Sequence, residues 1–149
     1  MKRFVIIAAS WFGTGYSPIA SGTVGTLAAI PFYLPLSRLP LPLYLLTTVT
    51  FILFAIWVSD RAEMIYGGHD SSRIVIDEVA GFLVTMTALP LSLFSVIAGF
   101  FLFRFFDIVK PSPVRNIDRH MGGGRGVVLD DVAAGIYACI VLHVLVRFW

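Results

Sequence analysis

The sequence predicts an all-α protein, a small multi-pass membrane helical bundle. Three observations predict this class. Hydrophobic residues make up 58% of the 149 residues and charged residues only 13%, whereas soluble domains contain about 25% charged residues. The mean hydropathy is +0.88. No segment alternates with the period of two that a half-buried strand requires, and a bilayer admits only helices or closed barrels.

Five apolar segments account for the bundle, and we expect residues 1–149 to form a single membrane-embedded domain, as this length favours. Two segments, 41–59 and 132–149, approach the ~20 residues that cross a bilayer as one helix. The others are shorter, and the first of them either crosses or re-enters; they cover 24–37, 74–90 and 91–106. The prediction is therefore four to five membrane segments.

Two proline-containing junctions divide these segments into hairpins. Proline lacks the N–H that an interior helical residue donates, so "LSRLPLPL" (36–43) and "ALPLS" (88–92) each predict a reversal of the chain. The start, "MKRFVIIAAS" (1–10), has an apolar core shorter than the roughly 7–15 residues of a secretory signal. We expect it to be a retained amphipathic or interfacial lead-in.

The charged residues are confined to a small part of the sequence. All nine acidic residues lie within 60–78 and 107–131, and folding the two hairpins brings both windows to one side of the bundle. Most Lys and Arg residues share that side, which the positive-inside rule makes cytoplasmic. The net charge is only +2 and no basic stripe is interleaved with aromatic residues, which argues against a nucleic-acid partner.

Paired acidic residues recur in "VIDEVAG" (75–81) and "VLDDVAAG" (128–135). One acid at a helix start is explained by capping, but neighbours on a helix diverge by about 100°, so both cannot cap well. A further carboxylate, Asp107, comes at the end of another apolar segment. Carboxylates converging from three helix ends make an oxygen-rich site that suits Mg²⁺, and the small residues behind them allow close helix packing. The candidate ligands are Asp77, Glu78, Asp107, Asp130 and Asp131.

Basic residues flank the third of these carboxylates. Arg104 precedes Asp107 by three positions and Lys110 follows it by three, so all three would share one face if the helix continues that far. Arg115 follows in a stretch interrupted by proline and glycine. Arg and Lys beside a metal suit a phosphate group, although a positive loop beside anionic lipid would also contain them.

The segment "SPIASGTVGTLAAIP" (17–31) reads as a loop rich in glycine and hydroxyl residues that runs into an apolar helix. Backbone N–H groups exposed there would cradle an anion. The segment lacks the Lys of a nucleotide-binding GxxxxGK[ST] loop. Ser and Gly before a membrane helix more often form only a helix cap and a close helix contact.

Four motifs carry a family resemblance, and they cover most of the chain, from Ser21 to Ala138. They are "SGTVGTLAAIP" (21–31), "IVIDEVAGF" (74–82), "FRFFDIVKPSPVRNID" (103–118) and "GGGRGVVLDDVAAGIYA" (122–138). In this order and spacing the sequence closely resembles the phosphatidylglycerophosphatase A family. The resemblance implies a Mg²⁺-dependent phosphatase of the bacterial inner membrane with its active site facing the cytoplasm. Its phospholipid substrate would be phosphatidylglycerophosphate, hydrolysed to phosphatidylglycerol and inorganic phosphate.

The resemblance also assigns roles to residues. It makes the five carboxylates the metal and catalytic set: Asp77, Glu78, Asp107, Asp130 and Asp131. The implied phosphate contacts are Ser21, Gly22, Thr23, Thr26, Arg104, Lys110 and Arg115. In the linker 66–73 the likeness is weaker, and Asp70 is carried over with it only as a minor candidate.

Two mechanisms and two other functions stay open at this point. Either a water activated by the metal and one carboxylate attacks phosphorus, or one Asp attacks directly and forms an acyl phosphate. A divalent-cation transporter would also need acids in a helical bundle, but it needs them at mid-membrane. A CDP-alcohol phosphotransferase, another Mg²⁺-dependent headgroup enzyme, would carry a DGxxAR…GxxxDxxxD pattern, which this sequence lacks.

Overall fold

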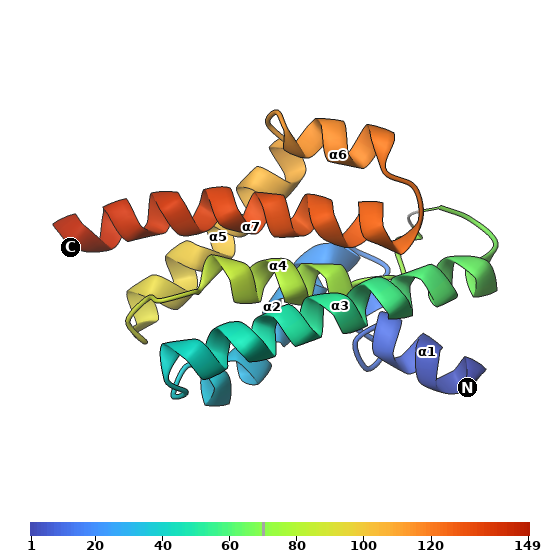
Figure 1. Cartoon of the computed structure of the whole chain (residues 1–149), viewed down its shortest axis with the longest axis horizontal. Helices are drawn as coiled ribbons and strands as arrows, with labels where there is room; N and C mark the ends of the chain where they lie inside the picture. Colours follow the sequence, from blue (N-terminus) through green and yellow to red (C-terminus); the bar gives the residue numbers. More distant parts are fainter. Residues whose placement is uncertain (70) are drawn as a thin grey trace.

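The computed structural model describes residues 1–69 and 71–149, apart from the side chains of Ile117 and Asp118. Asp70 therefore lies outside the described residues. Over the described ranges the chain forms seven α-helices and one 3₁₀ helix, which confirms the all-helical class (Figure 1). These are α1 (Lys2–Ala9), η1 (Thr14–Tyr16), α2 (Ser21–Leu36), α3 (Leu41–Tyr66), α4 (Ile76–Thr85), α5 (Leu93–Val109), α6 (Val114–His120) and α7 (Gly123–Phe148).

The short helix α4 lies at the centre of the bundle, packed against α2, α3, α5 and α7 (Figure 1). Eight of its ten residues are buried. A Cβ added to Gly135 of α7 would collide with the carbonyl oxygen of Gly81 in α4, and one added to Gly81 would come within 2.8 Å of the carbonyl oxygen of Asp131. Glycine at both positions thus lets α4 and α7 approach closely, as the small residues behind the acidic pairs predict.

Both predicted chain reversals are present, but the first hairpin packs differently from the expectation. Helix α2 ends at Leu36 and α3 begins at Leu41, while α4 ends at Thr85 and α5 begins at Leu93. However, α2 packs mainly against α4, and α3 packs mainly against α7 and then α4, rather than against each other. The rings of Phe32 and Phe51 still connect α2 to α3, with centroids 5.4 Å apart.

The prediction that 74–90 is a membrane segment was wrong about the extent of the helix. Only Ile76–Thr85 is helical, and ten residues rise about 15 Å, half of the ~30 Å hydrocarbon core. Beyond this helix the chain turns, Ala88 adopts a left-handed φ of 58°, and Pro90 follows. The segment therefore does not cross a bilayer as one helix.

Two predicted helix starts were also wrong. The residues 21–26 form the first turns of α2 instead of a loop. Helix α7 begins at Gly123, so the acidic pair at 130–131 lies about two turns inside the helix. The glycine run at 122–124, which usually breaks a helix, here allows α7 to approach α3: the Gly124 N–H donates to Asp60 Oδ1, and a Cβ on Gly124 would collide with the α3 backbone.

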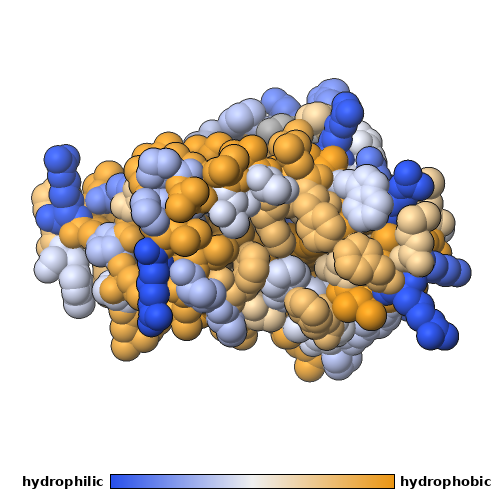
Figure 2. All heavy atoms as spheres, turned by 60° about the horizontal axis from the view of Figure 1, so that its bottom comes forward, coloured by the Kyte–Doolittle hydropathy of each residue, from blue (hydrophilic) through white to orange (hydrophobic). Residues whose placement is uncertain are grey.

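Much of the molecular surface is hydrophobic. Two helices, α3 and α7, are long and apolar enough to cross a membrane. Figure 2 shows hydrophobic atoms over most of one face, with the most hydrophilic atoms mainly toward its ends. An exposed apolar surface of this extent is typical of proteins that contact lipid. Large exposed side chains recur every three or four residues along α5 (Leu93, Ile97, Phe101, Phe105, Ile108) and α7 (Ile136, Ile140, Val144, Phe148).

Candidate active site

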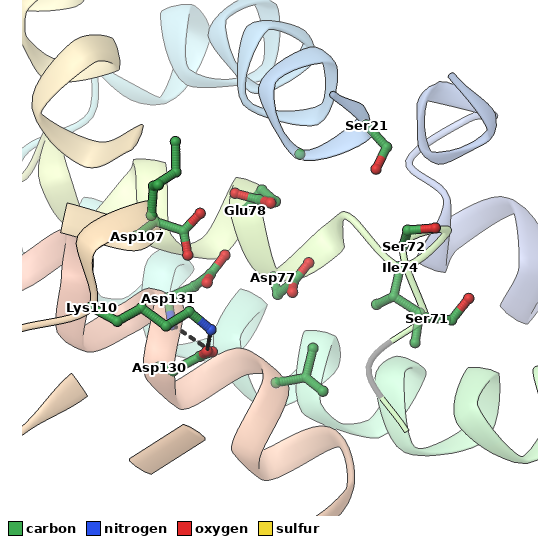
Figure 3. A pocket seen from close by; sticks show the side chains of 13 residues that line it. Ser21, Ser71, Ser72, Ile74, Asp77, Glu78, Asp107, Lys110, Asp130 and Asp131 are labelled. Atoms are coloured by element: carbon green, nitrogen blue, oxygen red, sulfur yellow. Dashed lines mark hydrogen bonds and ion pairs between the residues drawn. The ribbon is translucent and has the colours of Figure 1, made fainter. Parts of the chain in front are cut away.

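A polar cavity of about 250 Å³ lies where α2, α4, α5, α7 and the linker before α4 meet. Figure 3 shows side chains from these elements around a common space. The C-terminal part of α5 and the N-terminal end of α4 both lie toward the same end of the bundle (Figure 1). All five predicted carboxylates line the cavity, together with Lys110: Asp77 and Glu78 from α4, Asp107 from α5, and Asp130 and Asp131 from α7.

An arginine joins two of these carboxylates. The Arg104 Nη1 group donates to Glu78 Oε2 and, at 2.8 Å, to Asp107 Oδ2. The three side chains are 12–15% exposed, so water screens these ion pairs little. Charge-assisted hydrogen bonds of this kind are stronger than neutral ones, and this one connects α4 to α5.

A lysine makes a second link, from α5 to α7. Helix α5 ends at Val109, and Lys110 follows in a left-handed conformation with φ 47°, so the helix stops short of the shared face that the spacing predicts. The side chain nevertheless reaches the cavity, where Nζ lies 2.8 Å from Asp130 Oδ2 (Figure 3). Two cations therefore stand among five carboxylates, which leaves the cavity with an excess of acidic groups.

The geometry of the acids suits a bound metal ion. Carboxylate oxygens of Glu78, Asp107 and Asp131 all lie within 4.8 Å of one another. Among the described residues, two buried carboxylate oxygens, Asp77 Oδ1 and Asp131 Oδ2, have no hydrogen-bond partner. A buried carboxylate oxygen without a partner is costly unless a cation compensates it. This cluster of hard oxygen ligands is therefore able to hold a metal ion.

The predicted phosphate contacts in the N-terminal motif occupy different places. Ser21 and Gly22 line the cavity, whereas Thr23 does not. Thr26 is buried, and its hydroxyl donates to the Gly22 carbonyl at 2.8 Å and to Glu78 Oε2 at 3.5 Å. A Cβ on Gly22 would collide with the Glu78 carboxylate, so glycine at this position lets α2 pack closely against the acidic cluster.

The remaining basic candidates lie outside the cavity lining. Arg104 pairs with the carboxylates but is not itself a lining residue, and Arg115 is exposed on α6. Their phosphate contacts stay predictions. Sequence reasoning missed two serines that do line the cavity, Ser71 and Ser72. They belong to a short linker without periodicity or a charged motif, so no signal marked them.

Comparison with known proteins identifies the family. A model of the phosphatidylglycerophosphatase A family matches residues 7–146. The chain belongs to this family. It is 40% identical over 139 residues to phosphatidylglycerophosphatase A of Escherichia coli (strain K12), covering 93% of this chain and 81% of the relative. The phosphatidylglycerophosphatase A of Haemophilus influenzae is 39% identical over 140 residues, covering 93% and 85% of the two chains.

Another relative carries a different name. A Bacteroides thetaiotaomicron protein named "Putative phosphatidylinositol-3-phosphatase" is 40% identical over 155 residues, which cover 97% of this chain and 96% of the relative. No solved structure matches the chain. The phosphatidylglycerophosphatase A motifs of the chain, with their five carboxylates, thus meet in one cavity of the bundle.

Proposed function

We propose that this member of the phosphatidylglycerophosphatase A family hydrolyses the terminal phosphate of phosphatidylglycerophosphate with Mg²⁺ held in its acidic cavity. The products are phosphatidylglycerol and inorganic phosphate. The observation that supports this most is the pair of buried, unpartnered oxygens, Asp77 Oδ1 and Asp131 Oδ2, in a cavity that also contains Lys110. These oxygens need a cation, and the cation and the lysine together suit a phosphate.

The residues present fit Mg²⁺ as the cation. Mg²⁺ prefers carboxylate and water oxygens and is usually held together with substrate phosphates. Nitrogen or sulfur ligands that would favour zinc or copper are absent from the lining described for this cavity. We assign the metal to the carboxylates of the cavity: Asp77, Glu78, Asp107, Asp130 and Asp131. When bound, the ion neutralises charge on the phosphate oxygens in the transition state.

The side chains of the cavity supply the other functions that the reaction needs. Lys110 would share its ammonium group between Asp130 and a phosphate oxygen, while Arg104 holds Glu78 and Asp107 in place through the contacts described above. A carboxylate of the cluster would take a proton from the attacking water. If an Asp attacked phosphorus instead, two successive displacements would follow. Stereochemistry at a chiral phosphorus distinguishes the routes: inversion indicates direct attack by water, and retention indicates an Asp nucleophile.

We also propose that the chain is a single domain that crosses the bacterial inner membrane several times and faces the cytoplasm with its active site. Helices α3 and α7 are the clear spanning candidates. Helix α5 presents an exposed apolar face that ends at Ile108, and this residue also lines the cavity. A lipid whose chains lie along α5 would therefore bring its headgroup to the carboxylates. Helix α2 would cross or re-enter beside it.

Phosphatidylinositol 3-phosphate is a second candidate substrate. The reason is the Bacteroides relative. Its sequence identity to this chain, 40%, equals that of the Escherichia coli relative, and the match covers 96% of its length. Both lipids present a phosphomonoester on a hydroxylated headgroup, and the metal-binding part of the cavity would treat the two phosphates alike. Discrimination must then come from other parts of the lining.

The test is phosphate release by the purified chain in lipid vesicles. We expect turnover of phosphatidylglycerophosphate with Mg²⁺, faster than turnover of phosphatidylinositol 3-phosphate, and loss of turnover with EDTA that added Mg²⁺ restores. Activity that persists through chelation would overturn the metal assignment. Faster turnover of the inositol lipid would replace the proposed substrate, and Mg²⁺ flux across the vesicle without phosphate release would favour a transporter.

A further inference from the structure

The cavity has two chemically different ends. One end carries the carboxylates and Lys110, from α4, α5 and α7. The other carries Ser71 and Ser72 from the linker before α4, with Ser21 of α2 beside them. In Figure 3 these two serines lie across the drawn site from Asp107 and Lys110. Among the described lining residues, the second end thus offers the hydroxyl groups of Ser71, Ser72 and Ser21.

The backbone of the serine-bearing segment is held in place on both sides. The Ile74 N–H donates to the Ser71 carbonyl at 2.8 Å, and the Val75 N–H donates to the Ala9 carbonyl of α1 at 2.9 Å. On the other side, a Cβ on Gly15 would collide with the Arg73 backbone, so the segment lies directly against η1. The backbone that carries Ser71 and Ser72 is therefore held in a defined position.

The one charged residue that follows these serines is engaged elsewhere. The Arg73 guanidinium lies 5.5 Å from the ring centroids of both Tyr16 and Tyr66, within the range of cation–π attraction. The hydroxyls of these two tyrosines are 3.0 Å apart. Arg73 is not among the residues that line the cavity. Ser71 and Ser72, and not Arg73, are therefore the residues of this segment that line the cavity.

The serine hydroxyls have hydrogen-bonding capacity to spare. The Ser71 oxygen accepts a long bond of 3.4 Å from the Arg73 N–H, which leaves its own O–H able to donate. Ser72 is exposed. A serine hydroxyl both donates and accepts, so it pairs well with a neutral alcohol. A phosphate dianion is drawn instead to the end that holds the metal and Lys110.

We propose that Ser71 and Ser72 bind the hydroxyl that the substrate headgroup carries on the carbon next to the phosphorylated carbon. This inference rests on the proposed function. Phosphatidylglycerophosphate has one such hydroxyl, on its glycerol linker, and phosphatidylinositol 3-phosphate has two, on the ring carbons either side of the phosphorylated one. The cavity volume of about 250 Å³ is just below the range of pockets for drug-sized ligands, about 300–1,000 Å³, which matches a headgroup fragment.

This assignment makes the serines specificity-determining residues. A site built to hydrogen-bond a substrate hydroxyl discriminates strongly against an analogue without it. The chain should therefore distinguish phosphatidylglycerophosphate from an analogue in which propane-1,3-diol replaces the glycerol linker. The two lipids have the same charge and differ by one oxygen atom, so a difference between their rates reports on that hydroxyl.

The experiment combines this analogue with three variants, Ser71→Ala, Ser72→Ala and the double variant. For the wild type we expect kcat/KM to be at least about tenfold lower for the deoxy analogue. Each single variant should lose about two- to tenfold on phosphatidylglycerophosphate and little on the analogue. The double variant should treat the two lipids alike. Its activity on the analogue also shows that it is folded.

Ser37→Ala is the matched control. Ser37 is at the far end of α2, where its hydroxyl donates to the Leu34 carbonyl at 2.7 Å, and its loss should leave the ratio of the two substrates unchanged. A double Ser71/Ser72 variant that kept the wild-type ratio would overturn the inference while the proposed function stood. A wild-type chain that released phosphate from neither lipid would overturn both.

Discussion

The two acidic pairs of the cavity occupy different positions on their helices. Asp77 and Glu78 lie in the first turn of α4, where free N–H groups and the helix dipole favour negative charge. Asp130 and Asp131 lie about two turns inside α7 and are 4% and 3% exposed, where neither effect helps them. The helix terminus offsets part of the cost of the α4 acids, whereas the α7 pair gains nothing from a terminus and depends on Lys110 and on a bound cation. The α7 pair is therefore the stronger indication of a cation site.

The largest expected effect is a loss of activity that is the same for a substitution in either acidic pair. Asp77→Asn and Asp131→Asn each remove a carboxylate charge with little change of shape, and each should lower phosphate release by about 10³-fold. Steady-state assays in vesicles measure the loss. If only Asp131→Asn were inactive, the α4 pair would be a cap and not part of the site.

The next largest effect is expected where α4 and α7 cross and bring the two acidic pairs together. Gly135→Ala should push α7 away from the Gly81 carbonyl, cost about 1–3 kcal/mol of stability and lower activity about 10²-fold through misplacement of the acids. Gly99→Ala is the control, because its Cβ would meet the flexible Met86 thioether. Equal activity of the two variants would show that the close approach of α4 and α7 is unimportant.

A smaller effect is expected at the basic residues. Lys110→Ala should lower kcat/KM about tenfold because a phosphate contact is lost. Arg115→Ala should change it by less than about twofold, since this exposed side chain does not line the cavity. An Arg115 effect as large as that of Lys110 would place the phosphate differently from our proposal.

The smallest expected effect is a difference in the free energy of unfolding between variants of the two acidic pairs. Without metal, Asp131→Asn should raise the free energy of unfolding because it removes a buried negative charge from a cluster of like charges. Asp77→Asn should raise the free energy of unfolding by about 0.3–1 kcal/mol less than Asp131→Asn does, because it also removes a favourable helix-dipole interaction. Unfolding in detergent with EDTA measures both. The reverse order would contradict the positions assigned to the pairs.

Some of these features could be predicted from the local sequence, and others depend on tertiary packing. Proline at 88–92 predicted a reversal because its missing N–H is a local property, and small residues at Gly81 and Gly135 predicted close packing. The start of α7 was mispredicted because a glycine run is locally unfavourable to a helix and is stabilised here by its contacts with α3. Ser71 and Ser72 reach the cavity only through the packing of their segment against η1 and α1, which no local pattern encodes.

The most direct test of the central claim is Mg²⁺ binding by titration calorimetry on the wild type, Asp77→Asn and Asp131→Asn. If the two pairs form one site, either substitution alone should weaken the whole of the binding by at least about 10–100-fold. If they formed separate sites, each variant would keep the undisturbed half of the binding at wild-type affinity. That retained half would contradict the account.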